Sequence, residues 1–380
     1  MTRLRGMTWG HRRAIDPLIG TLARFRELHP DIDVQWDARS LAGFEFQPVE
    51  DLARNYDLII LDHPFMGDAA KKGYLKDLAP LLEGRDRDYI GPSLASYRHG
   101  KAIFAVPVDA AAQVAVYRPD LMARMDAAPP RSWEEVISLS QRAQRHGLQL
   151  AIAYSGVHGL MTFFTLMASL GRACSQMPGD AFCDRAAARD VLRLMRSLAS
   201  VCPKEILDWN SIALHESLAK ADGLAYCPAV YCYATYAEAD RRHPLRFADL
   251  PGVSSRSPNG STIGGTGLAV SARCKAPDAA MAYARFAAAA QTQMSFALSH
   301  GQPARIEAWL DDELDLHFGG AYSATRATLE GAWIRPRYAG YLVFQKRGGD
   351  LMEQHLRSNL SEAELLEELE KAFAASGEQQ

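Results

Sequence analysis

The sequence lacks the apolar run and the charge excess that mark membrane-spanning and nucleic-acid-binding proteins. Its longest apolar stretch, residues 159–171, contains Thr162, Thr165 and Ser169 and is shorter than the roughly 20 residues that a membrane span needs. We interpret this stretch as a buried helix and expect no membrane insertion. Lys and Arg number 42 against 45 Asp and Glu, for a net charge of −3. Without a basic stripe, we expect no nucleic-acid partner.

Catalytic and nucleotide-binding motifs are also missing. The chain has no P-loop, no Gly-x-Ser-x-Gly elbow and no His-Glu-x-x-His helix. The glycines of 264–267 lack the dinucleotide-binding spacing and precede a strand pattern, so they indicate a tight turn or a close backbone approach. Eleven histidines are scattered without metal-ligand spacing. We therefore expect no catalytic residues, no metal site and no cofactor.

Six cysteines occur without a Cys-x-x-Cys pair. An even number permits disulfides, but the low density favours reduced thiols in the core. Near the amino terminus, Trp9 and the basic residues 11–13 stand where a signal peptide would have an apolar segment of about 7–15 residues. As the sequence is written we expect a cytoplasmic protein, and a periplasmic one if the true start lies upstream.

Length and composition describe a globular chain. It has 380 residues, of which 48% are hydrophobic and 23% are charged. This length predicts two or three domains, or two lobes that share interleaved chain. Strand patterns over 3–9, 31–36 and 58–61 alternate with the helical spacing of 15–25, which predicts an α/β lobe.

Further elements follow along the chain. Ser132 with Glu135, and Ser361 with Glu364, fit capping boxes that open helices. Pro228 within a strand pattern indicates an edge or a break. The other expected elements are strands over 148–153, 223–231 and 266–271, helices over 191–198 and 278–298, and a turn over 256–262.

Several segments, in the same order along nearly the whole chain, resemble the bacterial extracellular solute-binding proteins of ABC importers, family 1, which include sugar binders. The segments that carry this resemblance are Met7–Trp9, Phe25–Val34, Tyr56–Ile59, Ala105–Asp109, Val116–Leu121, Pro130–Val136, Gly264–Val270, Ala276–Phe286 and Arg335–Tyr341. The similarity is more specific for the fold than for the ligand.

The resemblance implies a two-lobed α/β fold of the periplasmic-binding-protein type, with a hinge and a ligand cleft between the lobes. It places residues 1–108 and 265–308 in lobe 1, and 109–264 and 309–380 in lobe 2. It also implies ABC transporter membrane subunits as partners. The missing export signal departs from the family pattern and leaves transport in question.

Candidate ligand-binding residues follow from the rule that open α/β sheets bind ligands beyond the carboxyl ends of their strands. After the first strand come Thr8, Trp9 and His11. The indole of Trp9 could stack on a sugar and donate its N–H, or it could be a core residue. Asp62 and His63 follow the apolar strand. The Asp62 carboxylate could accept two hydroxyl hydrogens, or it could cap a helix.

Later strands and crossings supply the remaining candidates. Asp109 could bind the ligand or bond within the hinge, and Tyr231 and Tyr233 could form an aromatic wall or a packed core pair. Gly265 and Thr266 could offer backbone N–H groups. The full set of later candidates is Asp109, Gln113, His158, Tyr231, Tyr233, Gly265, Thr266 and Gln302.

The candidate side chains are histidines, aspartates and aromatics, which suit a small polar, hydroxylated ligand. Arg335 and Arg337 could clamp a carboxylate or phosphate, but such arginines more often pair with surface acids. The first hypothesis is therefore a non-enzymatic protein that binds a small, sugar-like metabolite. The alternative is a cytosolic enzyme or a metabolite sensor built on the same fold.

Overall fold

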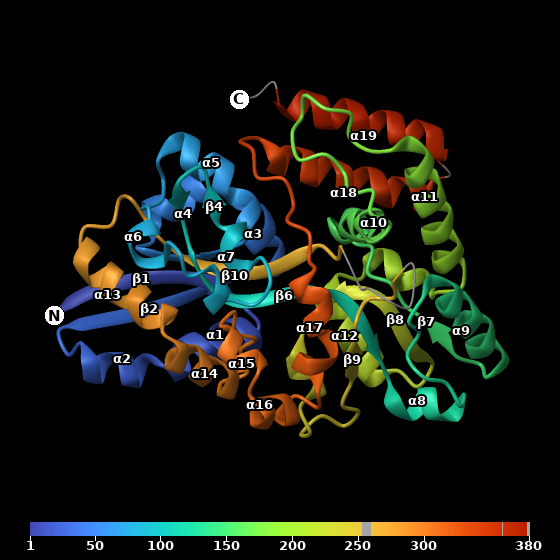
Figure 1. Ribbon diagram of the computed structural model, residues 1–380, viewed down its shortest axis with the longest axis horizontal. Coiled ribbons are helices and arrows are strands. Elements are labelled where there is room, and N and C mark those ends of the chain that lie inside the picture. The colour runs from blue at the N-terminus through green and yellow to red at the C-terminus, as the bar shows by residue number, and fades with distance from the viewer. Residues whose placement is uncertain (253–259, 359, 378–380) are drawn as a thin grey trace. The chain divides into compact units, whose positions relative to one another are not determined.

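The computed structural model describes residues 1–252, 260–358 and 360–377, so most of the turn expected at 256–262 lies outside the described residues. The chain forms two compact units, each with strands and helices (Figure 1). Unit 1 contains Met1–Ala110, Gly264–Leu314 and Arg337–Leu342. Unit 2 contains Ala111–Ile263, Asp315–Pro336 and the described residues from Val343 onward. Residues 109–110, 264, 309–314 and 337–342, which we expected in lobe 2, thus belong to unit 1.

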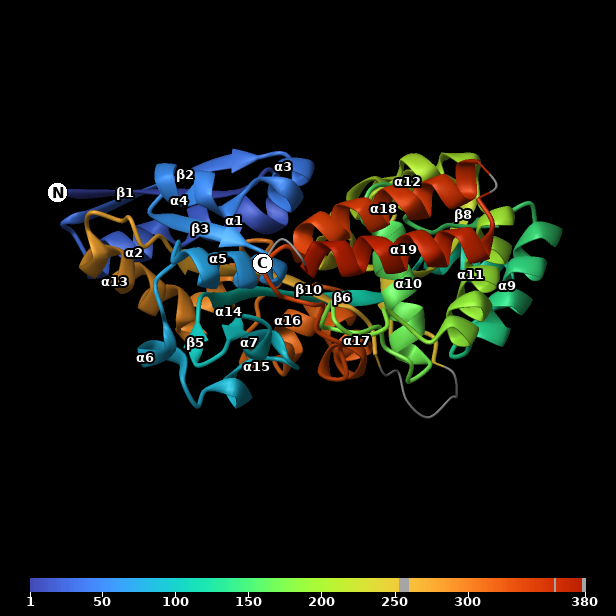
Figure 2. The same ribbon diagram turned by 90° about the horizontal axis from the view of Figure 1, so that it is seen from above.

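In unit 1, the strands of the large sheet follow the order β2-β1-β3-β10. They are β1 (Thr2–Trp9), β2 (Ile32–Arg39), β3 (Leu58–Leu61) and β10 (Ile263–Val270). Strand β1 pairs in parallel with both β2 and β3, whereas β10 runs antiparallel to β3. Figure 2 shows β2, β1 and β3 side by side. All four residues of β3 are buried, as its continuous apolar sequence predicts.

The register of these strands brings separate parts of the sequence to one edge. Trp9 lies opposite Arg39, and Leu61 lies opposite Gly267. Because β1, β2 and β3 run parallel, their carboxyl ends meet at the same edge. Strand β10 enters the sheet from that edge because it runs the other way. Trp9, Arg39 and Asp62 therefore share the edge at which α/β sheets bind ligands.

The helices of unit 1 are short and connect or follow its strands. The first expected helix, over 15–25, is divided at Thr21 into two. The helices are α1 (Arg12–Gly20), α2 (Leu22–Leu28), α3 (Leu41–Phe46), α4 (Val49–Asn55), α5 (Met66–Lys72), α6 (Ala79–Leu82), α7 (Ser93–Ser96), α13 (Pro277–Ala288), α14 (Ala290–Leu298) and α15 (Ile306–Trp309). Helix α16 (Asp312–His317) begins in unit 1 and ends in unit 2. The 3-10 turns η1 (His63–Phe65) and η2 (Asp86–Asp88) and the strand pair β4 (Arg98–His99) and β5 (Ala102–Ile103) complete the unit.

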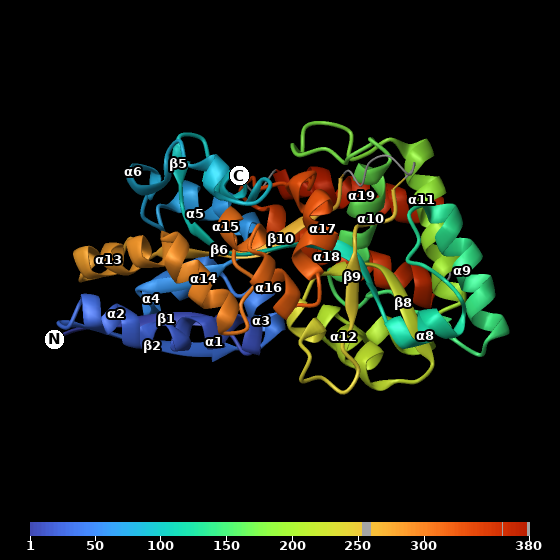
Figure 3. The same ribbon diagram turned by 60° about the horizontal axis from the view of Figure 1, so that its bottom comes forward.

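The single helix expected over 278–298 is two helices, α13 and α14 (Figure 3). Ala289 between them is extended, with ψ of 138°. The buried side chain of Gln293 holds this break. Its Nε2 donates to the carbonyls of Ala287 (3.1 Å) and Pro107 (2.7 Å), and its Oε1 accepts from the N–H groups of Ala304 and Arg305, each at 2.9 Å. A tertiary contact, not a helix-breaking residue, therefore divides the alanine-rich segment.

Unit 2 contains the order β6-β8-β7, with β9 paired to β6. The strands are β6 (Val106–Tyr117), which begins in unit 1, β7 (Gln149–Leu150), β8 (Leu224–Tyr231) and β9 (Arg246–Ala248). The strand expected over 148–153 is thus only two residues long. Strand β8 is central, so Pro228 does not mark an edge. Instead the β6–β8 register shifts where Pro228 lies, and the proline marks a bulge.

The core of unit 2 forms around α10 (His158–Ser169), whose residues 158–168 are all buried. This confirms the expected buried helix. Phe182 stacks on Phe163 at 6.3 Å and contacts Phe344 and Phe373, each at 5.2 Å. The aromatic side chains thus join α10 to the last two helices.

The other elements of unit 2 are helical. They are α8 (Pro119–Arg124), α9 (Trp133–Arg145), α11 (Arg185–Ser200), α12 (Ser211–Lys220), α17 (Ala321–Glu330), α18 (Tyr341–Arg357), which begins in unit 1, α19 (Glu362–Gly377), η3 (Lys204–Asp208) and η4 (Ala234–Ala237).

Both expected capping serines lie at helix starts. The Oγ of Ser361 accepts from the N–H of Glu364 at 3.2 Å, and the Glu364 carboxylate accepts from the N–H of Ser361 at 2.9 Å, which completes the box. Ser132 likewise accepts from the N–H of Glu135. The Glu135 carboxylate, however, accepts from the N–H of Arg131 at 2.7 Å, one residue earlier than the capping box requires.

The Gln293 contacts generate a stability prediction. We expect Gln293→Ala to lower the free energy of unfolding by about 3 kcal/mol, because four buried backbone groups lose their partner. Denaturant unfolding measures the change. Gln291→Ala is the matched control, because Gln291 is exposed on the same helix. Equal stability of the two variants would contradict the assigned role of Gln293.

Candidate functional site

Thr8 and Trp9 end β1 with polar atoms that the rest of the chain leaves unsatisfied. Both side chains are buried, at 0% and 4% exposure. The Trp9 ring packs on Phe44 with centroids 4.9 Å apart. Thr8 Oγ1 and Trp9 Nε1 have no hydrogen-bond partner among the described residues. Because a buried polar atom without a partner costs free energy, these two atoms are candidate contacts for a ligand or an ordered water.

His11, the third candidate near β1, caps the next helix. Its Nδ1 accepts from the backbone N–H of Arg13 at 3.2 Å, which places the imidazole at the N-terminus of α1. The role of His11 as a ligand contact stays a prediction. The structure gives it the capping contact.

Asp62 and His63 pair directly. His63 Nδ1 lies 2.8 Å from Asp62 Oδ1, and the same oxygen accepts from the His63 backbone N–H at 2.8 Å. Adjacent residues of a strand point to opposite faces, but these two follow β3, and the chain turns into η1 at His63. His63 is fully buried, whereas the Asp62 side chain is 19% exposed. The carboxylate is thus the accessible member of the pair.

A buried ion pair lies close to the end of β1. Arg13 Nε donates to Asp109 Oδ1 at 2.7 Å, and Arg13 Nη2 donates to Oδ2 at 2.6 Å. The side chains are only 4% and 7% exposed. Burial raises the pKa of Asp109, while the Arg13 charge and the Thr266 N–H act in the opposite direction. Both carboxylate oxygens are engaged within the protein, so Asp109 acts as an anchor of this region.

The backbone around Asp109 is closely fitted. Gly265 has a φ of +89°, and a Cβ there would lie 2.3 Å from the carbonyl oxygen of Asp109. Glycine is therefore required at this crossing. The next N–H, that of Thr266, bonds the Asp109 carboxylate. Gln302 Nε2 donates to the carbonyl of Ala110 at 2.7 Å, and the Gln302 carbonyl accepts from the Ala110 N–H.

Four predicted residues share one small cavity in unit 1. Trp9, Asp109, Thr266 and Gln302 line it, together with Arg13. The cavity has a volume of about 20 Å³, which is close to the space that one water molecule requires. It is too small for a sugar ring. Within unit 1, a solute would therefore contact the strand edge rather than enter this cavity.

Sequence reasoning missed two arginines in unit 1. Arg13 is the second of two adjacent arginines, and nothing local distinguishes the one that pairs with Asp109. Arg39 ends β2 at the same edge as Trp9. Its Nη1 donates to Gln47 Oε1 at 3.0 Å, and its guanidinium lies 5.4 Å from the Phe44 ring centre. Burial lowers the pKa of Arg39 to about 10. The strand-end rule, applied to β2, could have identified Arg39.

In unit 2, three predicted residues gather near the N-terminus of α10. Gln113 and Tyr231 are cross-strand partners in β6 and β8. The rings of Tyr231 and His158 meet edge to face at 6.5 Å. His158 Nδ1 lies 3.2 Å from Ser211 Oγ. Burial, assisted by the charge of Arg335, lowers the pKa of His158 to about 4, so the ring is neutral at pH 7.

Tyr233 does not continue the predicted aromatic wall. Strand β8 ends at Tyr231, so strand alternation no longer fixes the direction of Tyr233. Its ring packs 5.5 Å from His215 and 6.4 Å from Tyr236, and the side chain is 5% exposed. These contacts correspond to the packed-core alternative for Tyr233.

The two late arginines have separate protein partners. Arg337 Nη1 donates to the carbonyls of Ala95 (2.7 Å), Ser96 (2.9 Å) and Arg98 (2.7 Å) and thereby closes the end of α7. Arg335 Nη1 donates to Gln345 Oε1 at 2.9 Å. Neither partner is a surface acid, and the contacts of Arg337 hold backbone rather than present its charge to a ligand.

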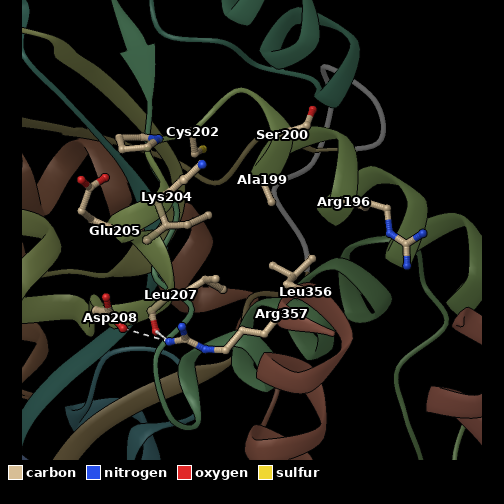
Figure 4. Close-up of a pocket in the computed structure, with 12 residues that line it drawn as sticks. Arg196, Ala199, Ser200, Cys202, Lys204, Glu205, Leu207, Asp208, Leu356 and Arg357 are labelled. Carbon is tan, nitrogen blue, oxygen red and sulfur yellow. Dashed lines mark hydrogen bonds and ion pairs between the residues drawn. The ribbon is translucent and has the colours of Figure 1, made fainter. Parts of the chain in front are cut away.

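A larger cavity in unit 2, of about 910 Å³, contains none of the predicted site residues. It lies where α11 and α18 end beside η3 (Figure 4). Arg357 Nη2 closes part of its rim by donating to Asp208 Oδ1 at 2.9 Å and to the Leu207 carbonyl at 3.0 Å. Its lining contains basic residues such as Arg196 and Lys204 as well as acidic ones, so it favours neither a positively nor a negatively charged ligand.

Across the described ranges, no three His, Cys, Asp or Glu side chains gather in an arrangement that could hold a metal ion. In the same parts of the chain, no helix is both long and apolar enough to cross a membrane.

The neutral state of His158 predicts a pH dependence of stability. Its folded pKa of about 4 lies below the ~6.5 of an ordinary histidine, so the unfolded chain binds the proton first. The stability from neutral His158 is present above pH ~6.5 and is lost as the pH falls toward 4. Over that window we expect wild type to lose about 3 kcal/mol more than His158→Asn in denaturant unfolding. His146→Asn, at an exposed position, should keep the wild-type slope. The same slope in His158→Asn would refute this assignment.

The first half of the chain is similar to a known protein family. Residues 11–175 match the family model described as bacterial extracellular solute-binding protein. No curated protein matches the chain.

Solved structures match over almost the full length. The maltose-bound MalE3 of T. maritima is 18% identical with a TM-score of 0.83, covering 98% of this chain and 99% of that one. An ABC transporter solute-binding protein of Thermotoga lettingae, bound with α-D-tagatose, is 14% identical with a TM-score of 0.85, covering 99% and 100%. A third, from Agrobacterium radiobacter in complex with ribitol, is 17% identical with a TM-score of 0.81, covering 100% and 99%. The family match over residues 11–175 and the whole-chain fold confirm the predicted resemblance: this part of the chain is similar to bacterial extracellular solute-binding proteins, and the chain has the fold of the solved structures above.

Proposed function

We propose that this protein binds a small, neutral, hydroxylated solute of the sugar or polyol class. The observation that carries the proposal is the pair of buried, unpartnered polar atoms, Thr8 Oγ1 and Trp9 Nε1, at the ligand-binding edge of unit 1. Solved structures of the same fold that hold maltose, tagatose and ribitol support this class of solute.

The chemistry of the unit 1 edge fits hydroxyl groups. The Trp9 indole can donate one hydrogen bond, the Thr8 hydroxyl can donate and accept, and the partly exposed Asp62 carboxylate can accept from two hydroxyls. A polyol presents several donors and acceptors; because Thr8 and Trp9 are consecutive residues of β1, we propose that its hydroxyls reach them from the two faces at the end of the strand. Arg13 and Asp109 neutralise each other beneath the edge, so this ion pair does not favour a charged solute.

Unit 2 offers a second set of uncharged polar groups. Gln113 Oε1 is buried and has no partner among the described residues, although its Nε2 lies 3.4 Å from Thr162 Oγ1. His158 is neutral at pH 7, and Tyr231 supplies an aromatic ring beside it. We propose that these groups of unit 2 are also candidate contacts for a hydroxylated solute.

The enzyme and sensor alternatives are not favoured, because the family match and the solved structures above are all solute-binding proteins. We propose that the natural partners are the membrane subunits of an ABC importer and that the protein works outside the cytoplasm. The family's extracellular description supports this location.

A ligand panel tests the proposed solute class. Thermal unfolding should be measured with maltose, tagatose, ribitol, other monosaccharides, amino acids and small carboxylates. We expect a raised melting temperature with one or more sugars or polyols, because a ligand that binds only the folded state stabilises it. A shift with amino acids or carboxylates alone would overturn the sugar class, and no shift with any compound would overturn the proposal.

Two conservative variants test the proposed contacts. Thr8→Val and Trp9→Phe each remove one hydrogen-bonding group while keeping most of the side-chain volume. By calorimetric titration with the best sugar, we expect each to weaken binding about tenfold, the value of one hydrogen bond. Thr8→Val should leave the unliganded protein at least as stable as wild type, because it removes an unsatisfied hydroxyl.

Matched controls exist in unit 2. Thr235 Oγ1 and Trp133 Nε1 are also buried and unpartnered among the described residues, but they lie away from the strand ends named above. Thr235→Val and Trp133→Phe should leave the affinity unchanged. If all four variants bind like wild type, the contact assignment at the end of β1 is wrong even though a sugar binds.

A further inference from the structure

We propose that Cys174 and Cys183 form an intrachain disulfide that closes the loop between α10 and α11. All six cysteines carry free thiols in this structure. The thiols of Cys174 and Cys183 are nevertheless neighbours, because burial and then the adjacent Cys183 thiol raise the pKa of Cys174. This proposal concerns the covalent state of unit 2 and does not depend on the solute.

The backbone between the two cysteines holds them in a favourable geometry. The N–H of Ser175 donates to the carbonyl of Phe182 at 2.8 Å. This bond joins the residues just inside the two cysteines, so it brings Cys174 and Cys183 together at the start and end of the loop. Disulfides span Cα separations of about 4.4–6.8 Å, which residues flanking such a bond can meet.

Both ends of the loop are anchored. Phe182 is fully buried, and its N–H donates to Glu370 Oε1 of α19 at 3.0 Å. Asp184 follows Cys183 and caps α11, accepting from the N–H groups of Ala186 and Ala187. At the other end, the N–H of Arg172 bonds the carbonyl of Met167 in α10 at 3.0 Å. The backbone on both sides of the two cysteines is therefore held by contacts with the helices.

The other cysteines have different surroundings. Cys227 is buried, and its Sγ contacts the carbonyl of Ala229 at 3.6 Å. Burial raises the pKa of Cys202 to about 12 and that of Cys274 to about 11, and it raises the pKa of Cys174 as well, so proximity to a second thiol rather than acidity distinguishes the pair. Cys183, by contrast, is half-buried, while Cys174 is 4% exposed. Cys183 is therefore the thiol that a solvent oxidant reaches first, and Cys174 is the buried one.

The reaction needs a disulfide oxidant, for which oxidised glutathione serves as the probe. The Cys183 thiol loses its proton to water, and the thiolate attacks one glutathione sulfur. The glutathione S–S bond breaks, a Cys183–glutathione disulfide forms, and one glutathione thiolate leaves. Deprotonated Cys174 then attacks the Cys183 sulfur and releases the second glutathione. Two protein thiols are oxidised to one disulfide, and one oxidised glutathione is reduced to two thiols.

Mass spectrometry of the tryptic peptides from the full-length protein tests the proposal. Trypsin cleaves after Arg172 and Arg185, and no Lys or Arg lies between them, so one peptide, residues 173–185, carries both cysteines. The folded protein is oxidised with glutathione disulfide, unfolded, labelled with iodoacetamide and digested. We expect this peptide to be unlabelled and lighter by two hydrogen atoms. Two labels, or a persistent glutathione adduct, would overturn the proposal.

Variants and stability provide the controls. Cys174→Ser should trap glutathione on Cys183, whereas Cys202→Ser should leave the 173–185 peptide as in wild type. Oxidised wild type should melt about 5 °C higher than the reduced protein, because the closed loop restricts the unfolded chain. This difference should vanish in Cys183→Ser. Equal melting temperatures of oxidised and reduced wild type would contradict a closed loop.

Discussion

The bidentate ion pair between Arg13 and Asp109 is the constraint on which the unit 1 edge depends. It fixes the start of α1 against β6, with Thr266 of β10 bonding the same carboxylate. Gly265 allows the backbone of β10 to approach closely, and Gln302 binds the next residue of β6. Breaking a buried ion pair typically costs about 3–5 kcal/mol. Four segments distant in sequence are thereby held beside the end of β1.

The residues at this edge fall into two groups, those whose polar side-chain atoms bond to the protein and those whose polar atoms do not. The side chains of Asp109 and Gln302 form hydrogen bonds with other residues of the protein. Thr8 Oγ1 and Trp9 Nε1 are equally buried but have no partner among the described residues. Folded proteins satisfy nearly all buried polar atoms, so unpartnered ones that also lie at the carboxyl ends of strands mark where an outside molecule is expected. Rigid neighbours and unsatisfied atoms together make a preorganised recognition surface, which binds with little loss of conformational entropy.

Local patterns predicted local structure well, and tertiary contacts account for the misses. The apolar run 58–61 is β3 residue for residue, and the Ser361 capping box forms as expected. The break at Ala289 depends on Gln293, whose partners lie on other segments. Likewise, Arg13 is indistinguishable from Arg12 until Asp109 is placed beside it. The strand-end rule found Trp9 and Asp62, but it could not tell which polar atoms would remain unpaired.

A crystal structure with the sugar or polyol that most raises the melting temperature would test the central claim most directly. Our account predicts that solute hydroxyls lie within hydrogen-bond distance of Thr8 Oγ1 and Trp9 Nε1, while the Arg13–Asp109 pair stays intact beneath them. A solute bound elsewhere, for example in the cavity at the ends of α11 and α18, with water or nothing at Thr8 and Trp9, would contradict it.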